Sequence, residues 1–160
     1  MKSFVLSFCF LFSFFVTAQE LEWPDTIPST GANHTILFTL AQPITLNDTP
    51  IDDGALIGAF YLDDDGTSVC GGLGNYNSSS NFIIAAVGDD SSTEIKDGFD
   101  LNDFFDFYIQ INGMDYSLLA DYNLEGPFTD AYVSDGVSKI TSLTIVEVSE
   151  DLEGCTDPLY

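Results

Sequence analysis

The sequence predicts an all-β protein: a single-domain antiparallel β-sandwich of the immunoglobulin-like or jelly-roll-like kind. Three observations lead to this prediction. No window of eleven or more residues carries the apolar stripe of an amphipathic helix. Asp outnumbers Glu 19 to 7, and turn-forming Ser, Thr, Asn and Gly are frequent. Hydrophobic residues make up 45% of the 160-residue chain and aromatic residues 14%, which indicates a packed core rather than an acidic disordered chain.

The first half of the chain contains segments with the patterns of strands. Residues 35–40 alternate between apolar and polar side chains, as in a strand with one buried face. Residues 55–62 are apolar on both faces, which indicates a central strand covered on both sides. An acidic turn at 63–66 leads into a strand that begins at 68–70. Residues 82–87 then read as a second buried strand.

The second half contains the clearest strand pairing. Residues 105–111 alternate, with Phe and Ile on the face expected to be buried. Asn112-Gly113 follows, and this dipeptide favours the positive φ angles of a two-residue type I′ hairpin. The return strand is expected at 115–120 and a last strand at 140–148. About seven short strands with frequent turns favour the sandwich.

The N-terminus has the three-part layout of a secretory signal peptide, residues 1–18. A short basic start precedes the apolar run 4–16, and Thr17-Ala18 supplies small residues at the expected cleavage site. The run is shorter than the roughly 20 residues of a membrane span, although an N-terminal anchor helix is the alternative. We therefore expect a secreted or cell-surface protein, with the domain at 19–149 and no membrane insertion after cleavage.

The charge balance excludes several partners. The chain has 26 Asp and Glu against 3 Lys and no Arg, for a formal charge of −23. Nucleic acid requires clustered basic side chains, so it is excluded as a partner. Repulsion likewise excludes an anionic membrane surface. An extracellular protein or glycan is the expected partner.

Catalytic residues are scarce. His34 is the only histidine, and we expect it in an exposed loop, with Cys70 as a small buried residue. A Cys70–His34 dyad would need both side chains to meet and the thiol to be activated. An exported protein could form a Cys70–Cys155 disulfide, although we favour a Cys155 that is free or pairs with a cysteine outside this sequence. Because no nucleophile or zinc motif is present either, we expect the protein not to be an enzyme.

Calcium is the metal that the acidic turns could bind. It takes six to eight oxygen ligands from carboxylates and carbonyls, often on turns. The alternative is a solvated acidic surface with no bound metal. The carboxylates proposed as calcium ligands are Asp63, Asp65, Asp97, Asp100 and Asp103.

Two aromatic residues are candidates for carbohydrate binding. Trp23 and Tyr76 fall in expected loops, where an exposed ring could stack on a sugar. The alternative is that both pack on the edges of the sandwich.

Residues 31–111 contain a series of short motifs: Asn33-His34-Thr35-Ile36, Gly54 to Tyr61, Cys70-Gly71-Gly72, Tyr76-Asn77, Gly88-Asp89-Asp90 and Lys96-Asp97-Gly98-Phe99. In this order the motifs resemble a secreted β-sandwich module of cell-surface proteins in the Bacteroidota. The resemblance implies a sandwich fold and surface display.

The C-terminus, residues 150–160, reads as an acidic linker and the start of a further motif. Gly154-Cys155-Thr156-Asp157-Pro158 resembles the opening of repeats similar to thrombospondin type 3 repeats. This resemblance implies a truncated repeat whose first cysteine pairs further along, clustered aspartates that bind calcium, and type IX secretion through a later sorting domain.

These observations predict a non-catalytic extracellular interaction or adhesion module at the N-terminus of a larger secreted or surface protein. Residues 63–81 and 88–103 are the expected contact loops. The alternative is a calcium-dependent carbohydrate-binding module that accompanies a secreted hydrolase. The sandwich alone implies neither function.

Overall fold

The structure, a computed structural model, describes residues 21–146. Three predicted features lie wholly or partly outside this range: the signal peptide, the end of the last strand (residues 147–148) and the tail with Cys155. The described residues form a single all-β domain, which confirms the predicted fold class, and none belongs to a helix that could cross a membrane. The strands are β1 Asn33–Phe38, β2 Thr45–Leu46, β3 Thr49–Pro50, β4 Leu56–Leu62, β5 Ser68–Asn75, β6 Phe82–Val87, β7 Asp106–Ile111, β8 Met114–Tyr122 and β9 Val137–Ile145.

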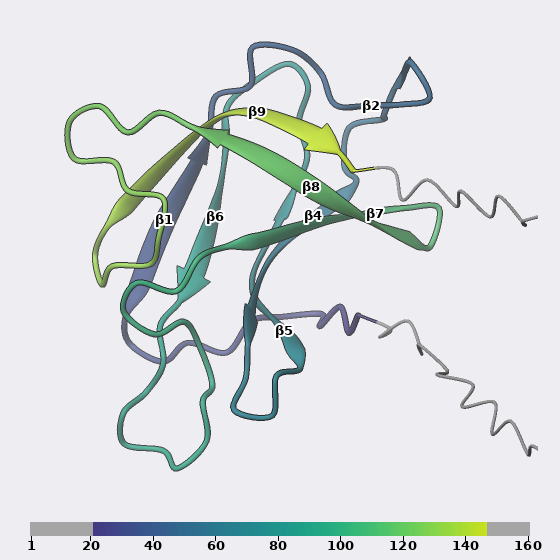
Figure 1. Ribbon diagram of the computed structural model, residues 1–160. Coiled ribbons are helices and arrows are strands. Elements are labelled where there is room, and N and C mark those ends of the chain that lie inside the picture. Colours follow the sequence, from purple (N-terminus) through teal and green to yellow (C-terminus); the bar gives the residue numbers. More distant parts are fainter. Residues whose placement is uncertain (1–20, 147–160) are drawn as a thin grey trace, which may run out of the picture.

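Seven of the strands form one curved sheet in the order β5-β4-β7-β8-β9-β1-β6, and β2 and β3 form a separate small hairpin (Figure 1). The sheet nearly closes on itself, because its two edge strands, β5 and β6, lie side by side. Every ladder is antiparallel except that of β1 with β9, which is parallel. The sheet is therefore mixed, a difference from the purely antiparallel pairing expected.

The core fills the space inside this curved sheet. On β1 the alternate residues His34, Ile36 and Phe38 point inward and are fully buried. Phe38 meets Phe107 of β7 edge-on across the core, with ring centroids 5.7 Å apart. Burial of each large apolar side chain contributes about 1.5–3 kcal/mol to folding.

Strand β4 is covered on both faces, as the sequence predicted. Ile57 and Ala59 belong to the core cluster inside the sheet. Phe60 lies on the opposite face, where Trp23 and Tyr108 contact its ring edge-on at 5.3 and 5.1 Å between centroids. The segment before β1 is therefore part of the domain, because it covers the outer face of its central strand.

The predicted hairpin is confirmed. Asn112 and Gly113 have φ angles of 53° and 77°, and they join β7 to β8 with Ile111 opposite Met114. A second turn of the same kind was missed: Asn47 and Asp48 have φ angles of 50° and 61° and join β2 to β3. The Asn-Asp pair is the signal that could have revealed it, because both residues tolerate positive φ.

Residues 82–87 form the predicted strand, but the prediction that this strand is buried holds for one of its faces only. Ile84 and Ala86 face the core, whereas Ile83 is 61% exposed and Ala85 is also exposed. The outward-pointing side chains of β6 are exposed, in contrast to those of β4, which are buried on both faces. An apolar run of six residues does not distinguish an edge strand from a central one.

Glycines allow the two edge strands to approach. A Cβ added to Gly72 of β5 would lie 2.7 Å from Ile84 Cγ2 and 3.0 Å from the backbone oxygen of Ala85. A Cβ on Gly74 would lie 2.8 Å from Ile84 Cγ1. Real Cβ atoms do not approach so closely, so glycine is required where β5 crosses β6.

We predict that Gly72→Ala lowers the free energy of unfolding by about 2 kcal/mol, because the new methyl group must push β5 away from β6. Urea denaturation followed by circular dichroism measures the change. The matched control is Asn75→Ala at the exposed end of the same strand, expected to stay within about 0.5 kcal/mol of the unmodified chain. A Gly72→Ala variant as stable as the control would contradict this account of the seam.

Candidate functional site

A pocket of about 480 Å³ lies between the start of β5 and the end of β6. Most of its walls come from the segment 22–28, the β4–β5 turn with the first residues of β5, and residues 95–97, and Tyr61 of β4 and Val87 of β6 complete them. Figure 1 shows the β4–β5 turn and the long connection 88–103 at the same end of the molecule. The two predicted contact loops therefore meet in one site, whereas the contribution of 22–28 was missed because that segment has no periodic pattern.

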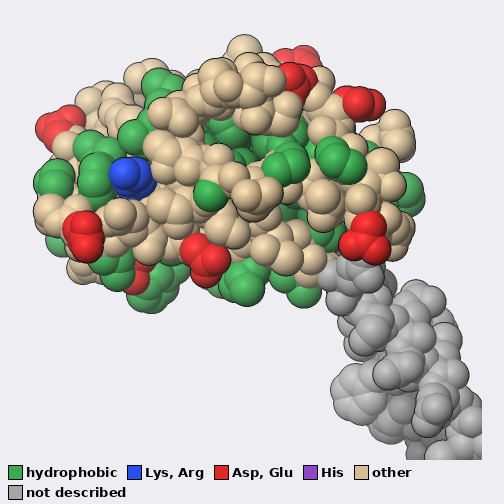
Figure 2. All heavy atoms as spheres, turned by 90° about the horizontal axis from the view of Figure 1, so that it is seen from above, with side chains coloured by type: hydrophobic (Ala, Val, Ile, Leu, Met, Phe, Trp, Pro, Cys, Tyr) green, Lys and Arg blue, Asp and Glu red, His purple; other side chains and the backbone are tan. Residues whose placement is uncertain are grey.

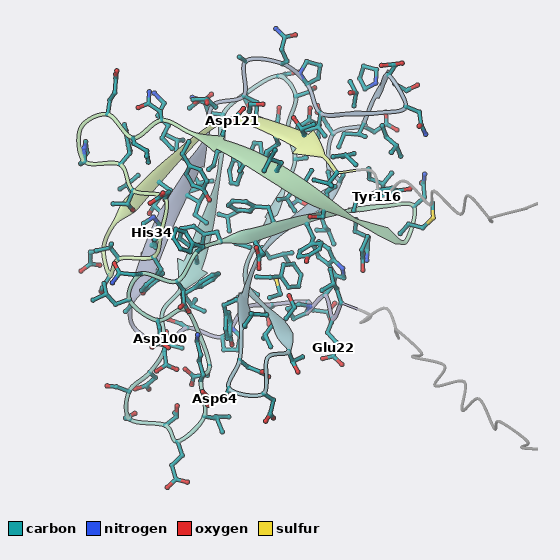
Figure 3. All side chains as sticks on the ribbon, viewed as in Figure 1. Glu22, His34, Asp64, Asp100, Tyr116 and Asp121 are labelled. Carbon is teal, nitrogen blue, oxygen red and sulfur yellow. The ribbon has the colours of Figure 1, made fainter. Side chains whose placement is uncertain are left out.

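The pocket has apolar walls and an acidic rim. The walls include Ile27, Val69 of β5, Val87 of β6 and Ile95. The polar lining includes the carboxylates Glu22, Asp63 and Asp97, together with Lys96. In Figure 3, Glu22 and the neighbouring Asp64 and Asp100 are labelled around this end of the fold.

Tyr61 lies at the inner side of the pocket and is almost completely buried. Its ring contacts that of Phe99, with centroids 5.2 Å apart. Burial, together with the negative charges of Asp97, Asp63 and Asp89, raises the pKa of Tyr61 to about 12. The phenol therefore stays protonated at neutral pH.

Lys96 is held by carboxylates outside the pocket lining. Its Nζ donates to Asp103 Oδ2 at 2.7 Å and lies 3.4 Å from Asp100 Oδ2. It also lies 5.6 Å from the centroid of the Tyr61 ring. Burial alone would lower the pKa of Lys96, but the hydrogen bonds to and charges of Asp103 and Asp100 raise it above its ordinary value. Lys96 is therefore charged, and its charge is balanced locally.

Hydrogen bonds hold the connection 88–103 against the end of β6. The Asp97 N–H donates to Asp89 Oδ1, and the Asp90 N–H donates to Asp97 Oδ1, both at 2.9 Å. A Cβ on Gly98 would lie 2.4 Å from the carbonyl carbon and oxygen of Gly88, so only glycine fits there. These contacts join the two motifs Gly88-Asp89-Asp90 and Lys96-Asp97-Gly98-Phe99 into one rigid unit.

The five predicted calcium ligands are engaged in other contacts or are exposed. Asp63 Oδ1 accepts the N–H groups of Asp65 and Thr67 within the β4–β5 turn. Asp97 holds the neighbouring connection, and Asp100 and Asp103 pair with Lys96. Asp65 is exposed at the turn. Within residues 21–146, no group of three or more His, Cys, Asp or Glu side chains is arranged to hold a metal ion. Calcium binding stays a prediction without a preformed ligand set.

Tyr76 lies in a loop after β5, as expected, but the expectation that it is exposed is wrong. Its side chain is only 1% exposed, and its hydroxyl accepts the N–H of Ile44 at 3.0 Å. Its ring also meets Phe82 edge-on. A ring so buried cannot stack on a sugar, and the loop composition around Tyr76 gave no sign of this core packing.

Trp23 is half-buried against the outer face of β4. Its indole Nε1 donates to Asp115 Oδ1 at 2.9 Å, a carboxylate that also accepts from Gln110 at 3.2 Å. Trp23 therefore attaches the segment before β1 to the sheet, as the edge-packing alternative expected.

His34 is buried in β1, and the expectation of an exposed loop is wrong. Its Nδ1 accepts the N–H of Val133 at 3.1 Å. In the neutral ring with this tautomer, Nε2 donates to Ser138 Oγ at 2.9 Å, and Ser138 in turn donates to the carbonyl of Thr129 at 2.6 Å. Burial lowers the pKa of His34, although the Val133 carbonyl oxygen, 3.0 Å from Nδ1, acts in the opposite direction because it can accept a hydrogen bond from the charged ring. His34 thus joins β1 to β9 and to the connection before it.

Cys70 is buried, and its thiol donates to the carbonyl of Gly72 at 3.3 Å. Burial raises the pKa of the thiol to about 11, so it is protonated at neutral pH. Because His34 contacts Val133 and Ser138 instead, the Cys70–His34 dyad is not formed. A disulfide between Cys70 and Cys155 stays untested, because Cys155 lies outside the described residues.

The first prediction from these contacts concerns pH. Because the folded chain binds a proton at His34 less readily than the unfolded chain, the free energy of unfolding should fall as the pH decreases below about 6.5. The slope is at most about 1.4 kcal/mol per pH unit. Urea denaturation between pH 8 and pH 5.5 measures it. His34→Gln removes the only histidine of the chain, and an unchanged slope in that variant would assign the effect to other groups.

The second prediction concerns the thiol. Raising the pKa from 9.0 to about 11 lowers the thiolate fraction at pH 8 about a hundredfold, so iodoacetamide should modify Cys70 at least that much more slowly than an unfolded thiol. Peptide-resolved mass spectrometry follows the reaction in the native chain and in urea. Equal rates in the two conditions would show that in solution Cys70 is not buried and that its pKa is not raised.

Comparisons of the chain with protein-family models, curated proteins and solved structures gave no match. No residue role is therefore transferred from a relative. The function is argued below from the pocket, its rim and the contacts that hold them.

Proposed function

We propose that the chain is a non-catalytic extracellular interaction or adhesion module that contacts its partner at the pocket. The observation that carries the proposal is the pocket of about 480 Å³, to which both predicted contact loops contribute. This volume lies within the range of about 300–1,000 Å³ that is usual for ligand-binding sites. The signal-peptide pattern of residues 1–18 and the resemblance to surface modules support display outside the cell.

The rigidity of the pocket supports a role in recognition. Backbone hydrogen bonds of 2.9 Å join Asp89 to Phe99 and Phe99 to Val87, and Asp63 organises the β4–β5 turn. Trp23 attaches the segment before β1 to the sheet. Walls held in this way lose little conformational freedom when a partner binds.

The proposal that the module is non-catalytic is supported by the positions of His34, the side chain that could act as a base, and Cys70, the one that could act as a nucleophile. His34 is enclosed in the core with both ring nitrogens in contact with partners. Cys70 lines the pocket but carries a protonated thiol. Neither group is placed to activate the other.

We predict that beads coated with the purified chain are retained on surfaces that carry its partner, and that Thr67→Trp lowers the retention at least fivefold. Thr67 lines the pocket with an exposed side chain, so a Trp there fills the opening without loss of a core contact. A flow assay over panels of immobilised extracellular proteins and glycans measures retention. Thr144→Trp, at an exposed threonine of β9 outside this pocket, is the matched control.

Two outcomes would contradict the proposal. Retention no better than that of albumin-coated beads on every surface would argue against an adhesion module. Equal retention of the Thr67→Trp and Thr144→Trp beads would place the contact elsewhere. A chelator is included in one arm: retention on glycans that is lost with the chelator would favour the calcium-dependent carbohydrate-binding module instead.

A further inference from the structure

We propose that the pocket between β5 and β6 receives a lysine or arginine side chain of a partner protein, flanked in that partner by apolar residues. The inference rests on the proposed function and names the chemistry of its contact. Three features of the pocket lead to it: apolar walls, unbalanced rim carboxylates and a local lysine that is already paired.

The walls suit the aliphatic part of a long basic side chain. Lysine and arginine place their methylene stems along apolar surface and keep the charged end at polar groups. Ile27, Val69 and Val87 provide such a surface within the pocket, and Ile95, which is 71% exposed, extends it to the rim. Apolar neighbours of the basic residue in the partner would contact this exposed part.

The rim carries negative charge that no described lysine balances. The described range contains two lysines, and Lys96 is paired with Asp100 and Asp103, neither of which lines the pocket. Lys139 lies elsewhere, over the ring of Phe128. Glu22, Asp63 and Asp97 remain as carboxylates at the pocket without an ion pair among the residues described.

Oxygen atoms remain available at this rim. Asp63 uses Oδ1 for both hydrogen bonds of its turn, so its second oxygen accepts none from the residues described. Asp97 uses Oδ1 for the Asp90 N–H, and its Oδ2 has only a 3.4 Å contact with the Thr93 hydroxyl. An ammonium or guanidinium group can therefore bind without disrupting the turns. The raised pKa of Tyr61, to which Asp97 and Asp63 contribute, agrees with a negative potential at the inner side of the pocket.

Charge also separates a protein partner from a glycan. The chain has a formal charge of −23, and Figure 2, which looks from above at the end of the molecule away from the pocket, shows carboxylate groups spread around that face too. An anionic glycan would be repelled by such a surface, and a neutral sugar would leave the rim carboxylates without a counter-charge. A basic residue within an apolar segment of a protein complements both the charge and the walls.

The test uses an acetylated and amidated pentapeptide, Ala-Leu-Lys-Leu-Ala, added to the isotope-labelled chain. Three comparison peptides are used: in two of them the Lys is replaced by Gln or by Glu, and in the third both Leu residues are replaced by Ser. Amide shifts in a heteronuclear NMR titration at low salt give the binding site and the Kd. We expect shifts at residues 68–70 and 95–97, and binding of the Lys peptide about tenfold tighter than that of the Gln peptide, because an ionised hydrogen bond is lost. The Ser-substituted peptide should also bind more weakly.

Charge-removing variants provide the second arm. Asp63→Asn and Asp97→Asn keep an amide oxygen for the hydrogen bonds of their turns while they remove the charge. Combined with Glu22→Gln, they should weaken the Lys peptide about tenfold or more. The matched control removes three charges outside the pocket lining through Asp48→Asn, Asp121→Asn and Glu125→Gln, and should change the Kd less than twofold.

Equal affinity for the Lys, Gln and Glu peptides, no binding of the Lys peptide at millimolar concentration, or equal effects of the two triple variants would overturn the inference. The two experiments together distinguish a failure of this inference from a failure of the proposed function. Bead retention that is sensitive to Thr67→Trp, together with no binding of the Lys peptide, would overturn only the basic side chain as occupant. Peptide binding at the pocket without bead retention would overturn only the adhesion role.

Discussion

The contact between the two edge strands is the constraint on which the candidate site depends. Gly72 and Gly74 bring β5 so close to β6 that no side chain fits between them. Towards the start of β5 the glycines give way to Val69 and Cys70, which line the pocket together with Val87 at the end of β6. The same pair of strands thus closes the sheet at one point and encloses the site beside it.

A chain with so few cations must use its carboxylates locally. Asp63, Asp89 and Asp97 accept backbone N–H groups, which stabilises their turns without any basic side chain. Such charge-assisted hydrogen bonds are stronger than neutral ones. Lys96 is the exception, and it neutralises two carboxylates beside the pocket rather than those at its rim. The acidic composition therefore organises the loops and leaves a negative rim.

Local patterns in the sequence predicted local structure well. The alternation before Asn112 and the Asn112-Gly113 pair gave the central hairpin, and the doubly apolar segment gave β4. Pairings between distant segments could not be predicted in this way. Nothing near β1 indicates that it joins β9 in parallel, or that His34 meets Ser138 across 104 positions. The burial of His34 follows from those pairings, and that of Tyr76 from its contacts with the distant Ile44 and with Phe82, so neither could be read from the neighbouring residues.

The distribution of hydrogen bonds also decides which cation suits the rim. Calcium needs six to eight oxygen ligands, whereas Asp63 and Asp97 use Oδ1 for the N–H groups of their turns and each offer only the second oxygen, so the described rim holds too few ligands for calcium. An ammonium group has three donors and a guanidinium five, and the remaining oxygens at the rim can accept several of them while the turns stay intact. Apolar walls next to the carboxylates add contacts that an inorganic ion cannot use. The geometry therefore favours an organic cation on an aliphatic stem over a bare divalent ion.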